Sequence, residues 1–243
     1  IHQLKIKNAR ITMSIEEKES LSEQIAKHIS EQIISGELVE GERIQELRIA
    51  KELDVSRGSV REALLILEHT HLIEIFPRRG AIVSEMSAQL VKSLFDTSSL
   101  FLMQIVQRIS ETWRNHEAES LQHLLVNLLA YVKQGNTEKF YDDIFQYLAM
   151  QQDMVANPYL MRFYQELLPS IRRSYFLTLN TSRRELQEAF ELFKLVIDAI
   201  LIRKTQQATL FMDDFCRHLR NLVLDSLARM KQIELAWARR SRR

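Results

Sequence analysis

The sequence contains few of the residues that cross-link a chain or interrupt a helix. Its 243 residues include one Cys, three Pro and five Gly. The single cysteine, Cys216, excludes an internal disulfide framework. So few glycines and prolines, set among long runs rich in Leu, Ile, Glu, Gln, Lys and Arg, favour a mainly α-helical protein with short connections and disfavour all-β and α/β folds.

Long apolar runs and export signals are missing as well. No segment approaches the roughly eighteen uninterrupted apolar residues of a membrane-spanning helix. The first 14 residues, IHQLKIKNARITMS, have neither an apolar signal core nor a small-residue cleavage site, and we interpret them as a flexible arm. We therefore expect a cytoplasmic protein with no membrane partner.

Familiar catalytic motifs are also absent from the sequence. It has no Gly-rich phosphate loop, no HExxH and no nucleophile elbow, and its histidines lack the spacing of metal ligands. We expect no enzymatic activity and no cofactor.

Net charge gives no indication of a polyanionic partner. The formal charge is +1, and up to Glu85 12 Lys and Arg stand against 15 Asp and Glu. Any nucleic-acid interface must therefore be a local patch, and the case for one depends on where individual basic residues stand.

The N-terminal third does contain a pattern of three short amphipathic helices. The first ends at Ser35-Gly36, the second spans 45–53 and leads into a tight turn at Asp54, and the third is capped by Ser56. The positions predicted to face inward are Leu21, Ile25, Ile29 and Ile33 in the first helix, Leu47, Ala50 and Leu53 in the second, and Val60, Ala63, Leu64 and Leu67 in the third.

A β-hairpin is predicted after these helices. The runs LIEIF and AIVSE favour strands, and the turn-like PRRG between them places Arg78 and Arg79 at the hairpin tip. Three helices followed by a hairpin predict a winged helix-turn-helix.

The third helix presents polar residues on the side opposite its apolar stripe. In helix-turn-helix proteins the first turn and a half of this helix contacts bases, and arginine there can bond to guanine or phosphate. The residues in this position are Ser56, Arg57, Gly58, Ser59 and Arg61. The arginines either contact DNA or are solvated, with Arg61 paired to a neighbouring Glu. Gly58 fits either close approach to DNA or simple tolerance in a first turn.

The rest of the chain shows helical periodicity almost throughout. Six helices are predicted near residues 87–113, 117–133, 137–155, 158–179, 182–203 and 206–233, and they would form an antiparallel bundle with its own core. We divide the chain into a flexible arm, a DNA-binding domain, a helical domain for effector binding and dimerisation, and a basic tail. Their ranges are 1–14, 15–85, 86–235 and 236–243.

One long segment resembles the N-terminal domain of the GntR family of bacterial transcription regulators. It is IAKHISEQIISGELVEGERIQELRIAKELDVSRGSVREALLILEHTHLIEIFPRRGAIV. In that family VSRGSVREAL corresponds to the recognition helix and PRRGAIV to the wing. The resemblance therefore implies DNA contacts by Arg57, Ser59, Arg61, Arg79 and Gly80.

A further contact is implied in the second helix. Arg48 lies in the helix that corresponds to a phosphate-contacting element of the family. FadR-type members carry an arginine where Leu47 stands here, so Arg48 is the candidate substitute for that contact.

The helical remainder resembles the FCD, or FadR-type, effector domain. Many FCD domains hold a metal ion with one aspartate and three histidines, and the resemblance implies Asp142, Gln146, Phe193 and Phe215 at these four positions. Glutamine binds transition metals poorly and phenylalanine not at all, so we expect no metal site. A shifted alignment would instead bring His218 near one of these positions.

The nature of the effector pocket stays open at this point. Arg172 and Arg173 either anchor an effector carboxylate or are ordinary surface arginines. The apolar candidates either line a cavity for a fatty-acyl or aromatic ligand or belong to a plain core. They are Phe145, Met150, Phe193, Met212 and Phe215.

These observations predict a transcription regulator that binds double-stranded operator DNA as a homodimer. Its helical domain is expected to sense a small-molecule effector such as a partly apolar carboxylate. The alternative is a DNA-binding regulator without an effector, whose helical domain only dimerises or binds other proteins.

Overall fold

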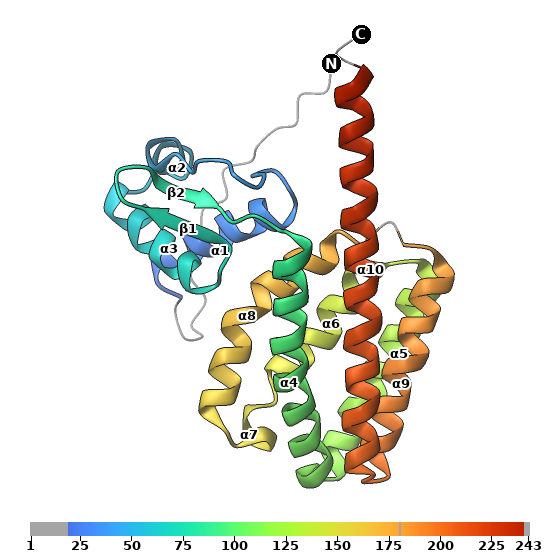
Figure 1. The fold of residues 1–243 in the computed structure, drawn as a ribbon. Coiled ribbons are helices and arrows are strands. Elements are labelled where there is room, and N and C mark those ends of the chain that lie inside the picture. The colour runs from blue at the N-terminus through green and yellow to red at the C-terminus, as the bar shows by residue number, and fades with distance from the viewer. Residues whose placement is uncertain (1–18, 180, 241–243) are drawn as a thin grey trace.

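The computed structural model describes residues 19–179 and 181–240, and within them it has ten helices and one two-stranded sheet. A small N-terminal domain sits at one end of a helical bundle (Figure 1). This arrangement confirms the predicted fold class. The predicted arm, residues 1–14, lies outside the described residues, as do the last three residues of the predicted basic tail.

The N-terminal domain contains three helices and a hairpin, as predicted. They are α1 (Leu21–Ile34), α2 (Glu46–Glu52), α3 (Arg57–His69), β1 (Ile73–Phe76) and β2 (Gly80–Val83). The predicted stripes of α1 and α3 are buried from Ile25 to Ile33 and from Val60 to Leu67, and they form one apolar core with the hairpin. Burial of these faces is the main stabilising contribution to this domain.

Two residues predicted to face inward are exposed instead. Leu21 is the first residue of α1 and extends past the end of the core, and Leu47 lies on the outer side of α2. In α2 the buried residues are Ile49 and Ala50. A helix of 7 residues makes only two turns, so its inward face cannot be fixed by periodicity.

The hairpin is antiparallel, with Ile73 opposite Val83 and Phe76 opposite Gly80. An isolated bridge between Arg43 and Ile82 extends its edge. Gly80 has φ +81, a left-handed conformation that suits glycine and lets the chain turn directly into β2.

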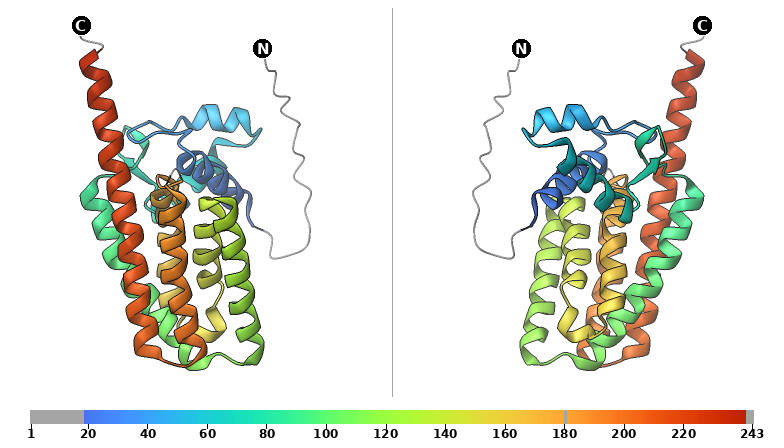
Figure 2. Two further views of the ribbon diagram at one scale, coloured as in Figure 1. Left: turned by 90° about the vertical axis from the view of Figure 1, so that its right-hand side faces the viewer. Right: turned by 90° about the vertical axis from the view of Figure 1, so that its left-hand side faces the viewer.

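Seven helices form the second domain (Figures 1 and 2). They are α4 (Ala88–Thr112), α5 (Asn115–Gln134), α6 (Thr137–Ala149), α7 (Gln152–Val155), α8 (Pro158–Phe176), α9 (Arg183–Leu201) and α10 (Thr205–Arg240). Helix α10 packs against α4 and α9, and α8 packs against α4 and α6. The helix predicted for 206–233 continues to Arg240, and its end extends past the bundle on the side of the N-terminal domain.

The single helix predicted for 137–155 is wrong, because the chain breaks it into α6 and α7. The break is stabilised by capping of the last carbonyls of α6. The backbone N–H of Met150 bonds to Gln146 and Tyr147, and the side-chain amide of Gln151 donates to the Tyr147 carbonyl at 2.7 Å. Polar capping of this kind ends a helix without leaving buried acceptors unpaired.

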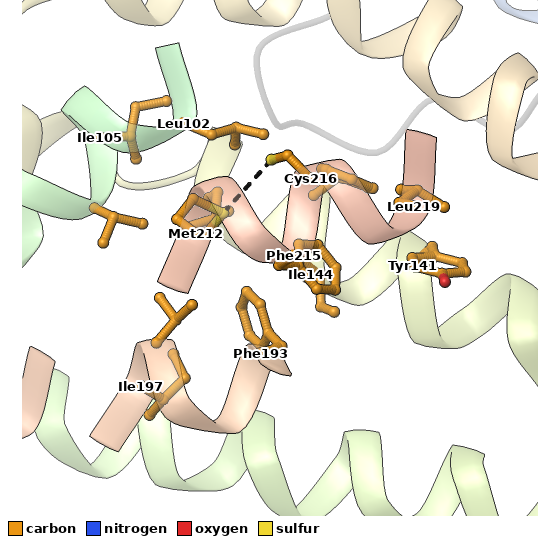
Figure 3. Close-up of a cluster of buried hydrophobic side chains, with 14 of the residues drawn as sticks. Leu102, Ile105, Tyr141, Ile144, Phe193, Ile197, Met212, Phe215, Cys216 and Leu219 are labelled. Atoms are coloured by element: carbon orange, nitrogen blue, oxygen red, sulfur yellow. Dashed lines mark hydrogen bonds between the residues drawn. The ribbon is translucent and has the colours of Figure 1, made fainter. Parts of the chain in front are cut away.

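Aromatic side chains fill the middle of the bundle (Figure 3). Phe193 of α9 and Phe215 of α10 are fully buried, with ring centroids 5.2 Å apart. Tyr141 and Phe145 of α6 lie 6.3 and 6.4 Å from Phe215. Of the helices in the described ranges, none is long and apolar enough to cross a membrane.

This packing predicts that Phe215→Ala will destabilise the bundle by about 3–5 kcal/mol, because it removes a buried ring and leaves a cavity. Urea unfolding followed by circular dichroism measures the change. The control is Leu210→Ala in the same helix, whose side chain is exposed and whose loss should change stability by less than about 0.5 kcal/mol. Equal effects of the two substitutions would contradict this account of the core.

Candidate nucleic-acid interface

The start of α3 is fixed by local interactions that the sequence predicts. Asp54 has φ +53, so the chain turns sharply between α2 and α3. Ser56 is the N-cap residue, and its Oγ accepts a hydrogen bond from the Ser59 backbone N–H at 3.0 Å. The two hydroxyls also lie 3.0 Å apart, within hydrogen-bonding distance. The first turn of α3 is therefore held in one orientation.

Both arginines of this turn pair with one carboxylate of α2. Arg61 Nε lies 2.9 Å from Glu46 Oε2, and an Arg57 guanidinium nitrogen lies 3.3 Å from the same oxygen. The arginine side chains are more than half exposed. Pairing with an acidic residue was anticipated only for Arg61. Glu46 was missed because it lies 11 and 15 residues away in sequence, outside any helical spacing.

The surroundings of Gly58 show whether packing inside the protein requires a glycine there. A Cβ added there would meet only Ser56 Oγ, at 3.5 Å, which is an ordinary contact. Packing inside the protein therefore does not require glycine at this position. Close approach to DNA and tolerance in the first turn both remain compatible with it.

The other predicted DNA-binding residues are also accessible. Arg48 is exposed on α2 and pairs with Glu52 at 3.3 Å, and Arg78 and Arg79 are exposed at the hairpin turn. Of the nine predicted residues only Ser59 and Gly80 are half-buried. The predicted set thus occupies α2, the first turns of α3 and the hairpin tip, with its basic groups open to solvent.

Comparison with known families agrees with this architecture. The model described as bacterial regulatory proteins of the gntR family matches residues 21–83, and the FCD domain matches residues 94–221. The chain belongs to the GntR family. Its second domain is an FCD domain, and GntR proteins of this kind are DNA-binding transcription regulators.

Individual relatives support the same assignment. The chain is 24% identical to the gluconate operon transcriptional repressor of Bacillus subtilis over 184 residues, which cover 74% of this chain and 73% of the repressor. The corresponding repressor of Bacillus licheniformis is 23% identical over 176 residues, 72% of this chain and 70% of the relative. A solved structure, E. coli McbR/YncC, shares the fold at a TM-score of 0.74 and 19% identity, covering 86% of this chain and 100% of that one.

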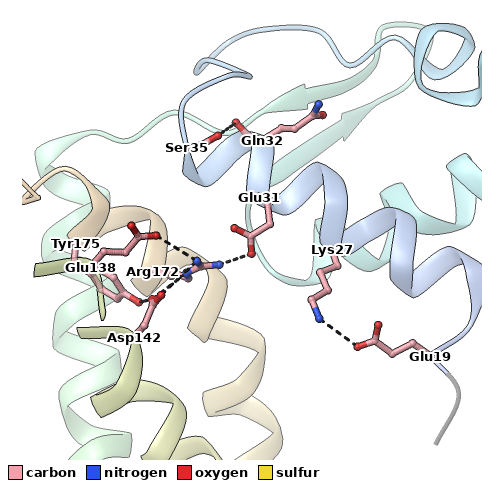
Figure 4. Close-up of polar contacts among 9 residues, drawn as sticks. All are labelled: Glu19, Lys27, Glu31, Gln32, Ser35, Glu138, Asp142, Arg172 and Tyr175. Carbon is pink, nitrogen blue, oxygen red and sulfur yellow. Dashed lines mark hydrogen bonds and ion pairs between the residues drawn. The ribbon is translucent and has the colours of Figure 1, made fainter. Parts of the chain in front are cut away.

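In this GntR protein the aspartate expected at an FCD metal site is engaged by other side chains (Figure 4). Arg172 Nε donates to Asp142 Oδ1 at 3.0 Å, and the Tyr175 hydroxyl donates to the same oxygen. Burial and the charge of Asp142 raise the pKa of Tyr175, so the phenol keeps its proton for this bond. Arg172 also pairs with Glu31 of α1, in the N-terminal domain.

The other three positions of the implied metal site do not gather around this aspartate. Gln146 is exposed on α6, whereas Phe193 and Phe215 are packed against each other in the core. Met150, a candidate for an apolar lining, is 73% exposed and cannot face the interior. His218 lines a separate cleft beside α9, and its Nε2 is buried without a hydrogen-bond partner among the residues described by the structure. Among the residues the structure describes, no three His, Cys, Asp or Glu side chains are placed to hold a metal.

The two candidate effector arginines lie at the boundary between the domains. Arg172 joins Asp142 to Glu31, and Arg173 donates to the Ser84 carbonyl at 2.8 Å in the linker before α4. Neither is an ordinary surface arginine. Glu31 was not anticipated, because only the folded chain brings it next to Arg172. Tyr175 was also missed, although its i,i+3 spacing from Arg172 on the predicted helix could have indicated it.

The donor set predicts that the purified protein will contain no stoichiometric transition metal. Asp142 is already bonded to Arg172 and Tyr175, and one carboxylate with water holds Zn²⁺ or Ni²⁺ weakly. Elemental analysis of protein prepared without a histidine tag measures this. About one metal per chain, lost on His218→Ala, would show that the ligand positions are shifted.

Proposed function

We propose that this regulator reads a specific operator through the first turns of α3. Arg57, Ser59 and Arg61 would contact base edges in the major groove, with Ser56 and Gly58 close to the backbone. The hairpin tip, with Arg78, Arg79 and Gly80, and Arg48 of α2 would bind phosphates or the adjacent minor groove. The observation that carries this proposal is the exposure of both α3 arginines on the side of the helix opposite its buried stripe.

Glu46 is compatible with this role and gives it a mechanism. In the free protein it offsets one of the two positive charges of Arg57 and Arg61 and pairs with both guanidinium groups. Contact with DNA would replace this partly exposed pairing by bonds to guanine or phosphate. Since exposed ion pairs contribute little to stability, the exchange costs little.

The FCD domain has a second proposed role, in effector sensing. The proposed ligand is a small, partly apolar carboxylate, which one of the boundary arginines would bind. Relatives named as operon repressors support repression as the output. The rings of Phe193 and Phe215 pack against each other, which favours a bundle interior that binds no ligand. In that alternative the helical domain would serve only for dimerisation or for binding other proteins.

Arg57→Ala and Arg61→Ala should each weaken operator binding by about 1–3 kcal/mol and relax preference at defined base pairs, because base contacts are lost. Arg78→Ala should weaken binding to all sequences and reduce the salt dependence, as expected for a phosphate contact. Fluorescence anisotropy with operator and scrambled DNA at several salt concentrations distinguishes these outcomes.

The matched control is Arg108→Ala, which removes one exposed positive charge from the C-terminal half of α4, away from the N-terminal domain. It should leave operator preference unchanged. If all three arginine variants bound operator DNA like the parent, the assignment of α3 as the helix that reads the operator would be refuted.

We further predict a homodimer that binds a pseudo-palindromic operator. One recognition helix covers only a few base pairs, and a twofold axis doubles the site. Analytical ultracentrifugation at micromolar concentration should give twice the mass of one chain, alone and on DNA. A monomer under both conditions would contradict this prediction.

A further inference from the structure

A cleft of about 480 Å³ opens between the two domains. Its walls come from β1, the linker to α4, the first turns of α4 and the C-terminal half of α8. Ile73 and Glu74 belong to the N-terminal domain, whereas Leu94, Leu167 and Arg173 belong to the bundle. This volume lies within the range of pockets that bind small molecules.

The larger side chains that line the cleft are mainly apolar. Ile73 and Val91 are buried, Leu94 and Leu167 are half-buried, and Leu90 is exposed. Apolar surface inside the cleft is therefore accessible to water. A ligand with a hydrocarbon portion would remove this surface from water, which is favourable.

Arg173 provides a positive charge in this apolar setting. It donates one hydrogen bond, to the Ser84 carbonyl, and forms no ion pair within the part of the chain that the structure describes. A guanidinium has five N–H donors, and buried arginines normally pair with an anion. Burial lowers the pKa of Arg173 and the more distant Glu40 opposes this, but the group stays charged at neutral pH. The site is complementary to one negative charge.

The rim of the cleft limits how much negative charge a ligand can carry. Glu74 and Glu85 line the cleft and are exposed to solvent. Their carboxylates would repel a second or third negative charge on the same ligand. Di- and tricarboxylates are therefore disfavoured relative to monocarboxylates.

We propose that this cleft binds a small monocarboxylate with a hydrocarbon portion, whose carboxylate pairs with Arg173 and whose apolar part covers Leu94 and Leu167. The inference rests on the effector role proposed above and names its site and ligand class. It places the ligand at the domain boundary rather than among Phe193 and Phe215. Because both domains line the cleft, a ligand that binds one relative placement of the domains more tightly would favour that placement.

The direct test is isothermal titration calorimetry of the full chain without DNA. The ligands are octanoate below its micelle concentration, 1-octanol as the uncharged analogue, and citrate as the tricarboxylate. Octanoate should bind at one site per chain. Octanol should bind about tenfold more weakly or worse, because it lacks the charge-assisted bond, and citrate should not bind measurably.

Three variants locate the site. Arg173→Gln should weaken octanoate binding by about tenfold or more. Arg162→Gln, an exposed arginine of the same helix, should bind like the parent. Thr97→Trp keeps Arg173 and its bond to Ser84 but fills the cleft from α4, where Thr97 is exposed, and should abolish binding. Thr97→Trp keeps the test decisive if Arg173→Gln disturbs the domain boundary.

The inference fails if octanoate does not bind the parent, if octanol or citrate binds as well as octanoate, or if Thr97→Trp leaves binding unchanged. Operator binding by the same preparation separates this from the function proposed above. Specific DNA binding without octanoate binding overturns only the cleft inference. The opposite outcome is that octanoate binds, that Arg173→Gln and Thr97→Trp abolish its binding, and that the protein shows no sequence preference on DNA. This outcome overturns the proposed operator reading instead.

Discussion

One half-buried cation, Arg172, forms an ion pair that joins the two domains. Its guanidinium bonds to Asp142 of α6 and to Glu31 of α1, so one group joins the bundle to the DNA-reading domain. Burial alone would lower the pKa of Arg172, but the bond to Glu31 and the charges of Asp142 and Glu31 raise it. Removing Arg172 would leave Asp142 and Glu31 without the positive charge that they share, so both carboxylates depend on this one group. Asp142, which the resemblance to FCD domains implies as a metal ligand, is here bonded to Arg172 and Tyr175.

At the proposed DNA-binding surface, the carboxylate of Glu46 likewise pairs with arginine side chains. Glu46 holds Arg57 and Arg61, as Asp142 and Glu31 hold Arg172, but its partners are more than half exposed. The Arg172–Asp142 pair, 22% and 26% exposed, is better shielded from water than the pairs of Glu46 with the α3 arginines. Glu31, however, is 51% exposed, as Arg57 is, so the ion pair between the domains is itself partly solvated.

The sequence predicted what short-range physics determines. The left-handed turn at Asp54 and the cap at Ser56 depend on residues within a few positions, and both are present. The bond between Arg172 and Glu31 spans 141 positions, and no local pattern encodes it. Likewise, the resemblance to FCD domains implied Gln146 as a ligand position, but only the packing of α6 shows that Phe145 is buried and Gln146 is exposed. The sequence showed which residues were candidates for each role. It did not show how their side chains are oriented or which distant residues they contact.

The contacts of α8 connect the helical bundle to α3, the helix proposed to contact DNA. Within four positions, Ser170 donates to the Thr70 carbonyl, Arg172 pairs with Glu31 and Arg173 donates to the Ser84 carbonyl. Thr70 is the C-cap residue of α3, so the C-terminal end of the recognition helix rests on α8. A helix of 13 residues is rigid over about 20 Å, and its other end carries Arg57. A shift of α8 would therefore act on α3, the helix whose other end holds the residues proposed to contact DNA.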